Sequence, residues 1–230
     1  RVLRKGLNVD HAHFTLMYPL PLASSSESVR KNFESNEFSA TRQIQYSLEN
    51  PREEIDMVLF VNGIPFATME LKNPWTGQNA KVHGQRQYKA ERDNRQPLLQ
   101  FGRCMVHLAA DTDEVFMTTR LNGKDTFFLP FNKGYNNGKG NPPVESGHKT
   151  NYLWNEVFKP ESIANIIQHF VKFDGKQADP LHKKTLFFPR YHQLDVVREI
   201  VDHVATNGVG HRYLIQHSAG SGKSYSITWA

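Results

Sequence analysis

The chain has 230 residues, of which 38% are hydrophobic and 22% are charged, a composition typical of a soluble globular protein. The sequence contains no run of about 18 apolar residues, which excludes a helical membrane span, and the single Cys104 excludes an internal disulfide and a multi-cysteine zinc site. The net charge of +5 favours a polyanionic partner, and the lone cysteine suits a reducing compartment, so we expect a cytoplasmic location.

Residues 28–47 predict a helix followed by a strand. Residues 28–37 suit a short helix, and residues 38–47 alternate between apolar and polar side chains, as a half-buried strand does. We expect this strand to lie beside the hairpin that follows it.

Residues 56–72 predict two short strands joined by a tight turn. The strands correspond to two apolar runs, and Asn62-Gly63 stands between them, which is the strongest short hairpin signal that a sequence offers. If the loop consists of residues 62–64, Asp56 lies directly opposite Glu70, and the two side chains share a face.

This pairing would bring two carboxylates and one ammonium group together. Lys72 stands two residues after Glu70 and therefore projects from the same face of the strand. Two carboxylates so close repel each other unless a cation joins them. Mg²⁺ binds one or two carboxylates and completes its coordination with water and substrate phosphate, so Asp56 and Glu70 predict a site for phosphodiester hydrolysis. Lys72 would position the nucleophile or stabilise charge at phosphorus. The alternative is a strand end with solvated charges.

A loop at residues 73–78 and a helix at residues 79–94 are expected next. Pro74 and Gly77 indicate the loop. On the helix, four polar or aromatic side chains share one face at helical spacing. They are Lys81, Gln85, Tyr88 and Arg92. A DNA-facing surface and a plain polar surface fit this helix equally well.

The middle of the chain predicts three strands, a loop and a helix. The strands are expected at residues 104–110, 115–120 and 126–131. Residues 133–149 are rich in Gly, Asn and Lys and predict a surface loop, with phosphate contacts as the alternative. An amphipathic helix is expected to begin near Pro160. This order of elements predicts an α/β core with a mixed sheet.

Residues 174–184 form the predicted domain boundary, because they are polar and contain glycine, proline and three lysines. Beyond them, the apolar spacing from Tyr191 to Val204 predicts a helix that ends at Asn207-Gly208. Residues 212–216 predict a short strand that leads directly into the sequence HSAGSGKS.

The sequence HSAGSGKS at residues 217–224 predicts a phosphate-binding loop between a strand and a helix. Its glycines allow backbone N–H groups to turn toward a phosphate. Lys223 would reach the β- and γ-phosphates of ATP, and Ser224 would bind the accompanying Mg²⁺. The predicted nucleotide-binding residues of the loop are Gly220, Ser221, Gly222, Lys223 and Ser224.

Asp56 together with the tripeptide Glu70-Leu71-Lys72 resembles the motif of PD-(D/E)xK nucleases, with Ile55 in the place of the usual proline. The resemblance implies that the metal ligands are Asp56, Glu70 and the carbonyl group of Leu71. It also implies that Asp56, Glu70 and Lys72 form the catalytic set.

Two further elements resemble parts of ATP-driven DNA enzymes. Nucleases in DNA motors carry a Gln-x-x-x-Tyr element after the catalytic strand. Here Gly84 takes the glutamine position, and the implied DNA contacts are Gln85, Gln87 and Tyr88. In superfamily 2 helicases, a glutamine upstream of the phosphate loop reads the edge of adenine, and Gln193 matches it. An amide suits this role because it offers both a donor and an acceptor.

A nuclease hairpin followed by a helicase-type ATP site resembles the R (restriction and motor) subunit of type I restriction-modification enzymes. The resemblance implies Mg²⁺-dependent cleavage of double-stranded DNA, coupled to ATP-driven translocation, by a type I site-specific deoxyribonuclease. It also implies assembly with methylation and specificity subunits. The segments that carry it are Phe60-Val-Asn-Gly-Ile-Pro, Glu70-Leu-Lys-Asn-Pro, Phe128-Leu-Pro-Phe-Asn, Phe188-Pro-Arg-Tyr-His-Gln and Leu214-Ile-Gln-His-Ser-Ala-Gly-Ser-Gly-Lys-Ser.

The implied organisation is a PD-(D/E)xK endonuclease domain at residues 1–173, a linker at residues 174–184, and the start of a RecA-like ATPase domain at residues 185–230. The chain ends inside a predicted helix and is therefore expected to be a fragment. Two alternatives remain open. One is a stand-alone helicase–nuclease of another DNA-processing system, and the other is a nuclease fold that clamps DNA without cutting it. The intact pair of carboxylates argues against the clamp.

Overall fold

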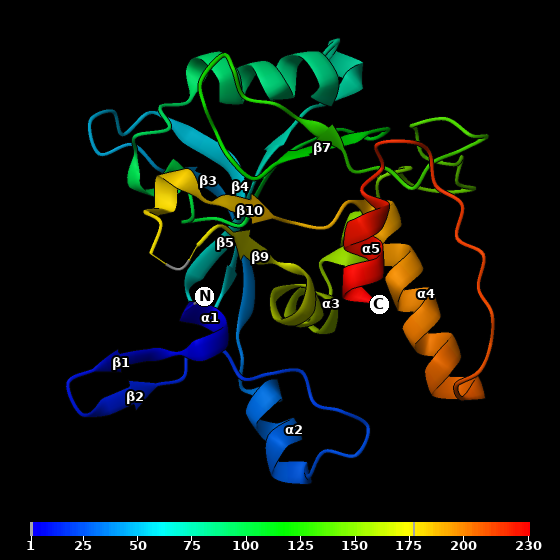
Figure 1. Ribbon diagram of the computed structural model, residues 1–230. Helices are drawn as coiled ribbons and strands as arrows, with labels where there is room; N and C mark the ends of the chain where they lie inside the picture. Colours follow the sequence, from blue (N-terminus) through cyan, green and yellow to red (C-terminus); the bar gives the residue numbers. More distant parts are fainter. Residues whose placement is uncertain (1, 177) are drawn as a thin grey trace.

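The computed structural model describes residues 2–176 and 178–230, and its centre is a six-stranded mixed sheet (Figure 1). The strand order is β3-β4-β5-β6-β7-β8, in which β5 and β6 are parallel and the other neighbouring strands are antiparallel. The strands are β3 (Phe38–Gln45), β4 (Glu54–Val61), β5 (Ile64–Leu71), β6 (Val106–Ala110), β7 (Val115–Thr118) and β8 (Leu129–Pro130). The predicted α/β fold with a mixed sheet is confirmed.

Short strands and helices surround this sheet. Two small antiparallel pairs are β1 (Leu7–Val9) with β2 (Ala12–Phe14), and β9 (Lys172–Asp174) with β10 (Thr185–Phe187). The α-helices are α1 (Val2–Lys5), α2 (Glu27–Glu34), α3 (Pro160–Asn165), α4 (Tyr191–Asn207) and α5 (Lys223–Trp229). The π-helical segments are η2 (Ala80–Gly84), η3 (Gln87–Glu91), η5 (Leu153–Val157) and η6 (Ile166–Phe170). The 3₁₀ turns are η1 (Pro74–Thr76), η4 (Pro97–Leu99) and η7 (Leu181–Lys183). No helix in the described ranges combines the length and apolar character that a membrane span requires.

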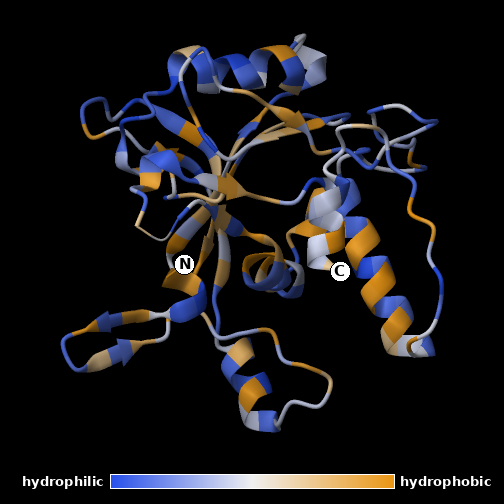
Figure 2. Cartoon of the chain, viewed as in Figure 1, coloured by the Kyte–Doolittle hydropathy of each residue, from blue (hydrophilic) through white to orange (hydrophobic). Residues whose placement is uncertain are grey.

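Apolar side chains cover both faces of the sheet because successive residues of each strand point to opposite sides. In Figure 2, most of the central strands are accordingly coloured on the hydrophobic side of the scale. One face packs against α3, η6 and α4 through residues that include Leu59, Met69, Leu108, Ile167 and Leu194. The other face packs against the helix of η2 and η3 through residues that include Val58, Ala80, Tyr88, Ala109 and Phe116.

The helix that connects β5 to β6 consists of the π-helical turns η2 and η3 with Gln85 and Arg86 between them. Two parallel neighbours require such a crossover. The helix ends at Glu91, three residues before the predicted end, because the backbone of Arg92 is extended (φ −102°, ψ 125°). Arg92 consequently leaves the helix axis and turns back toward the sheet.

The predicted strand at residues 212–216 is wrong, because residues 209–217 have no regular secondary structure. A strand needs a hydrogen-bonded neighbour, and no described segment pairs with this one. The expected start of a RecA-like sheet is therefore not formed here, and that fold stays a prediction.

The predicted boundary at residues 174–184 connects the paired strands β9 and β10. Beyond it, Leu186, Tyr191 and Leu194 are buried in the same apolar cluster as one face of the sheet. The hydrophobic core thus continues across this connection, and the division of the chain into two domains stays a prediction.

Candidate active site

The hairpin of β4 and β5 has a two-residue turn, whereas a three-residue loop was expected. Asn62 and Gly63 have φ values of 50° and 75°, and two successive positive φ values are the condition of a type I′ turn. A bulge follows: Phe66 has no partner on β4, and regular pairing resumes with Leu59 opposite Ala67.

The bulge restores the predicted alignment of the two carboxylates. Beyond it, pairing continues to Met57 opposite Met69, and the next position along each strand is Asp56 and Glu70. Without the bulge, a two-residue turn would place Met69 opposite Asp56. One extra residue in the strand therefore replaces one extra residue in the turn.

Lys72 joins the two carboxylates. Its Nζ lies 3.4 Å from Oδ2 of Asp56 and 3.8 Å from Oε2 of Glu70. The same ammonium group donates to the carbonyl oxygen of Leu71 at 3.2 Å, and the N–H group of Leu71 donates to Oδ2 of Asp56 at 2.8 Å. The Asp56 side chain remains 36% exposed, whereas the Lys72 side chain is largely buried. The fold thus brings together the three side chains of the predicted catalytic set.

The Glu70 side chain is completely buried and has an asymmetric environment. Its Oε1 accepts a hydrogen bond of 2.7 Å from Nε of Arg92, whereas Oε2 has no hydrogen-bond partner among the described residues. Burial raises the pKa of Glu70 to about 7, against the opposing effect of the Arg92 hydrogen bond, and the nearby charge of Asp56 adds to the rise.

Arg92 also belongs to this cluster, whereas its spacing predicts only a position on the polar face of the helix. Its guanidinium group lies 5.7 Å from the centre of the Tyr46 ring and forms the ion pair with Glu70. No motif spacing connects Arg92 with Glu70, because their contact depends on where the crossover helix ends.

Tyr88 is fully buried, which contradicts the expectation that it contacts DNA. Its hydroxyl group hydrogen-bonds with Oγ1 of Thr68 at 2.8 Å, and that oxygen also contacts Nδ1 of His107 at 2.7 Å. Burial lowers the pKa of His107 to about 3. The π-helical turns explain the discrepancy. With 3.6 residues per turn, Tyr88 would share the polar face with Lys81 and Gln85, but π-helical turns contain more residues and change which side chains share a face. Gln85 and Gln87 are partly exposed, and their DNA contacts stay a prediction.

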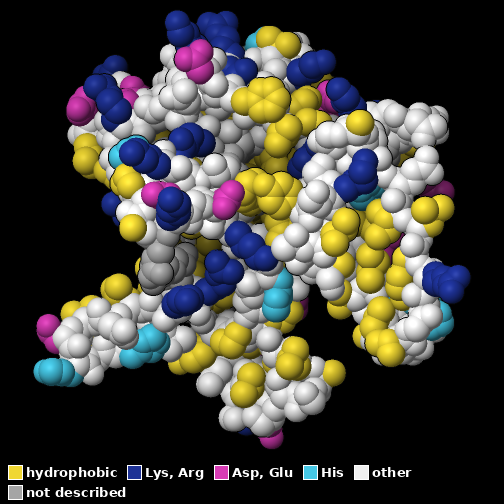
Figure 3. All heavy atoms as spheres, in the orientation of Figure 1, with side chains coloured by type: hydrophobic (Ala, Val, Ile, Leu, Met, Phe, Trp, Pro, Cys, Tyr) yellow, Lys and Arg dark blue, Asp and Glu magenta, His cyan; other side chains and the backbone are white. Residues whose placement is uncertain are grey.

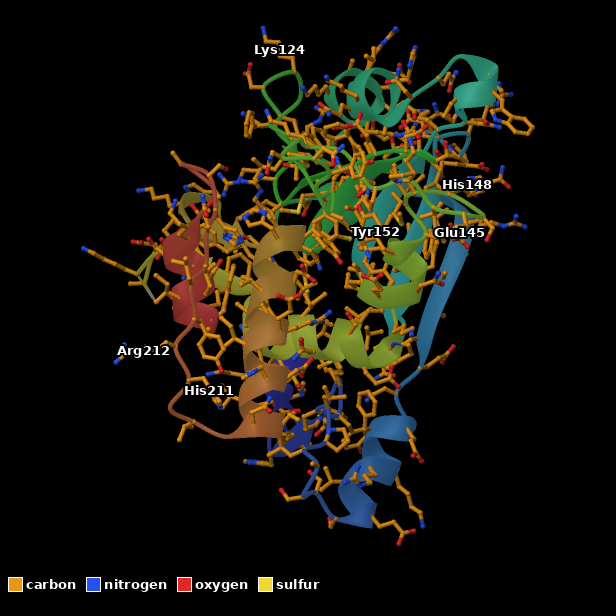
Figure 4. All side chains as sticks on the ribbon, turned by 90° about the vertical axis from the view of Figure 1, so that its right-hand side faces the viewer. Lys124, Glu145, His148, Tyr152, His211 and Arg212 are labelled. Atoms are coloured by element: carbon orange, nitrogen blue, oxygen red, sulfur yellow. The ribbon has the colours of Figure 1, made fainter. Side chains whose placement is uncertain are left out.

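A cleft opens beside Lys72, where the parallel strands β5 and β6 end. Its polar and aromatic lining includes Lys72, Asp111, Thr112, His148, Asn151 and Trp154. In Figure 4, His148 and Glu145 lie close together on one side of the molecule, whereas His211 and Arg212 lie on the opposite side. The cleft is therefore separate from the C-terminal segment.

The fold also places Gln193 against the predicted phosphate loop. Nε2 of Gln193 donates to the carbonyl oxygens of Gly222 at 3.0 Å and Ser221 at 3.3 Å, and Oε1 accepts from the N–H group of Arg190. Lys223 at the start of α5 donates to carbonyl oxygens of the same loop.

The ammonium group of Lys223 is therefore bound to carbonyl groups of its own loop in this conformation. Gly220 and Gly222 have positive φ values, as the predicted turn requires, and Ser224 is exposed. Nucleotide binding by the loop and by Gln193 stays a prediction.

Residues 25–126, which contain the cluster around Glu70, match the family model described as type I restriction enzyme R protein N terminus. The chain is 26% identical over 236 residues to the type I restriction enzyme HindI endonuclease subunit of Haemophilus influenzae. It is 25% identical over 224 residues to the putative type I restriction enzyme MjaIXP endonuclease subunit of Methanocaldococcus jannaschii. These alignments cover 99% and 86% of this chain but only 21% and 20% of the relatives. The chain thus spans about one fifth of the length of these curated relatives.

Proposed function

Because residues 25–126 match the family model of the R protein N terminus of type I restriction enzymes, we propose that this chain is the nuclease part of such an R subunit. It cleaves phosphodiester bonds of double-stranded DNA in a Mg²⁺-dependent reaction. For the whole protein, the proposal includes ATP-driven translocation and assembly with methylation and specificity subunits.

The observation that carries the proposal is the unpartnered Oε2 atom of the buried Glu70. A buried carboxylate oxygen without a partner is costly, and this one lies 3.8 Å from Lys72 and on the face that Asp56 shares. The described residues contain no group of three His, Cys, Asp or Glu side chains that could hold a metal. Two carboxylates nevertheless suit Mg²⁺, which keeps several water ligands and needs few protein ligands.

The residues that would hold the cation are Asp56, Glu70 and the carbonyl group of Leu71. When bound, Mg²⁺ supplies a Lewis acid that stabilises negative charge and lowers the pKa of a water molecule. Lys72 is held by Asp56 and by the Leu71 carbonyl, so its ammonium group is oriented before substrate arrives. From this position it orients the attacking water or donates to a phosphate oxygen.

The cleft beside Lys72 is proposed to accept the DNA strand that is cut. Ligands of α/β proteins commonly bind at the carboxyl ends of strands, and this cleft opens where β5 and β6 end. Trp154 in its wall is 41% exposed and offers an aromatic surface to a base. His148 and Asn151 offer hydrogen bonds to the sugar–phosphate backbone.

Asp56→Ala and Lys72→Ala in the full-length enzyme test the nuclease assignment. Each change should abolish double-strand cleavage and spare ATP hydrolysis, because both side chains belong to the proposed nuclease centre around Glu70 and not to the phosphate loop. Lys124→Ala, at an exposed lysine of another turn, is the control and should cut normally. Cleavage at the wild-type rate by either test variant would show that the nuclease centre lies elsewhere. A wild-type protein that binds DNA with Mg²⁺ but never cuts it would favour the clamp.

The ATP site is proposed to belong to a RecA-like domain that begins near residue 185. Measuring ATP turnover tests this proposal: residues 1–230 alone should show none, and Lys223→Ala in the intact protein should abolish both ATP hydrolysis and DNA cutting. A phosphate loop cradles phosphates, but in-line attack also needs a residue that orients water and an arginine finger, worth roughly 10³–10⁵ in rate. Turnover by the isolated 230 residues that is lost on Lys223→Ala would contradict the proposal.

A further inference from the structure

We propose that Arg92 is a positioning residue for the metal site: it fixes the carboxylate of Glu70 so that one oxygen is held by the protein and the other is presented to the cation. This inference rests on the proposed nuclease function and adds a residue that lies outside the nuclease motif.

The two carboxylate oxygens of Glu70 have different surroundings and therefore different roles. Nε of Arg92 binds Oε1 at 2.7 Å, and Oε2 points to the side of Lys72 without a hydrogen bond. A carboxylate with one oxygen held has its plane and rotamer fixed. Because the remaining oxygen is already placed, cation binding does not have to immobilise a freely rotating side chain.

Arg92 is itself held from the other side. Its side chain is only 11% exposed, and its guanidinium group packs over the ring of Tyr46. The hydroxyl group of Tyr46 donates to Oε2 of Glu53 at 2.6 Å, which fixes the ring. Arg92 therefore lies between an anchored aromatic ring and Glu70, and a swing out to solvent would break both contacts.

The charges of the cluster support the same role. Asp56 and Glu70 contribute two carboxylates, and Lys72 and Arg92 contribute two cations. A buried carboxylate without a paired cation is strongly destabilised in its ionised form. Since Lys72 is shared between both carboxylates, Arg92 is the cation that belongs to Glu70 alone among the described ion pairs.

The test is Mn²⁺ binding to the intact protein without nucleotide, measured by electron paramagnetic resonance. Arg92→Gln should weaken Mn²⁺ affinity by about 10- to 100-fold, the usual cost of removing a group that orients a metal ligand. Arg92→Lys, which keeps the charge but loses the Nε contact, should fall between Arg92→Gln and the wild type. In the DNA cleavage assay, a higher Mg²⁺ concentration should restore the rate of Arg92→Gln.

Arg86→Gln is the matched control, because Arg86 lies on the same helix and pairs with Glu91 on the exposed surface. It should bind Mn²⁺ as the wild type does. Unchanged Mn²⁺ binding by folded Arg92→Gln would overturn the proposal, because Arg92 would then not position the metal ligand. Tighter binding would overturn it as well, because Arg92 would then compete with the metal for Glu70. A wild-type protein that binds no Mn²⁺ would instead refute the proposed metal-dependent nuclease.

A crystal structure of the wild-type protein soaked with Mn²⁺ gives a test that does not depend on the folding of a variant. The Arg92–Glu70 hydrogen bond should persist in the soaked crystal, with the ion next to Oε2 of Glu70. An Arg92 side chain displaced from Glu70 by the ion would refute the proposal.

Discussion

At the scale of single residues, Glu70 links stability to pH. Its pKa rises from 4.5 to about 7 on folding, so the folded protein binds more protons than the unfolded chain between these values. The stabilising contribution of the protonated group is full below pH 4.5 and is lost as pH rises through 7. His107 acts in the opposite direction, because burial lowers its pKa to about 3.

Urea unfolding of the metal-free protein at pH 5 and pH 8 isolates the effect of Glu70 if the wild type is compared with Glu70→Gln. The glutamine cannot ionise, so the variant should gain stability relative to the wild type as pH rises. The expected change in this difference is on the order of 3 kcal/mol, at 1.36 kcal/mol per pKa unit. A difference that stays constant across this range would show that Glu70 ionises freely in the folded state.

The three motif residues could be predicted from the sequence, whereas Arg92 could not. Asp56, Glu70 and Lys72 are related by the alternation of strands, a rule that depends only on spacing. Arg92 reaches Glu70 because the helix ends at Glu91 and packs on the sheet. That arrangement is tertiary, and no local pattern encodes it.

At the scale of elements, Tyr88 attaches the crossover helix to β5. Tyr88→Phe removes the hydroxyl group that bonds to Thr68 but keeps the ring against His107 and Phe128. The free energy of unfolding should fall by about 1 kcal/mol, the usual net contribution of one hydrogen bond. DNA affinity, measured by fluorescence anisotropy, should not change, because the side chain is buried.

Gln85→Ala is the comparison for Tyr88→Phe, since Gln85 is partly exposed on the same helix. It should leave stability nearly unchanged and weaken DNA binding. The opposite pattern, with weaker DNA binding for Tyr88→Phe at unchanged stability, would show that Tyr88 contacts DNA after all.

Long periodic elements could be predicted from the sequence more accurately than local irregularities of the backbone. The hairpin at Asn62-Gly63 and the helix that ends at Asn207 were predicted correctly, since turn chemistry and apolar spacing determine them. The bulge at Phe66 and the π-helical turns were not. Each arises from fitting one element against another, so the sequence of the element alone does not reveal it.

At the scale of the whole molecule, α4 shares a core with the sheet. Leu194 on α4 is 2% exposed and belongs to the same apolar cluster as Met69 and Leu108. Leu194→Ala should therefore destabilise the entire described fold by about 2–5 kcal/mol, with one transition in urea. Val201→Ala, at a half-exposed position of the same helix, should cost much less. Two separate transitions, with only one affected by Leu194→Ala, would show that α4 unfolds independently.

The C-terminal segment contrasts with this core. Figure 3 shows apolar side chains gathered over α4 and the segment beside it, and Leu214 is 94% exposed. Such a surface commonly marks an interaction site. In the proposed RecA-like domain, neighbouring strands would cover it. The strand predicted at residues 212–216 is not formed, because no described segment forms the backbone hydrogen bonds that a strand needs.

The bulge at Phe66 restricts how this hairpin can change in evolution. The two-residue turn and the bulged residue together set the interval from Asp56 to Glu70. An insertion or deletion of two residues, one in each strand, lengthens or shortens the ribbon and leaves both carboxylates on one face. A change of a single residue sends Glu70 to the opposite face unless a bulge is gained or lost at the same time. Among descendants of a common ancestor, this interval should therefore vary in steps of two, and odd steps should mark lineages that have moved the bulge or lost the proposed cleavage activity.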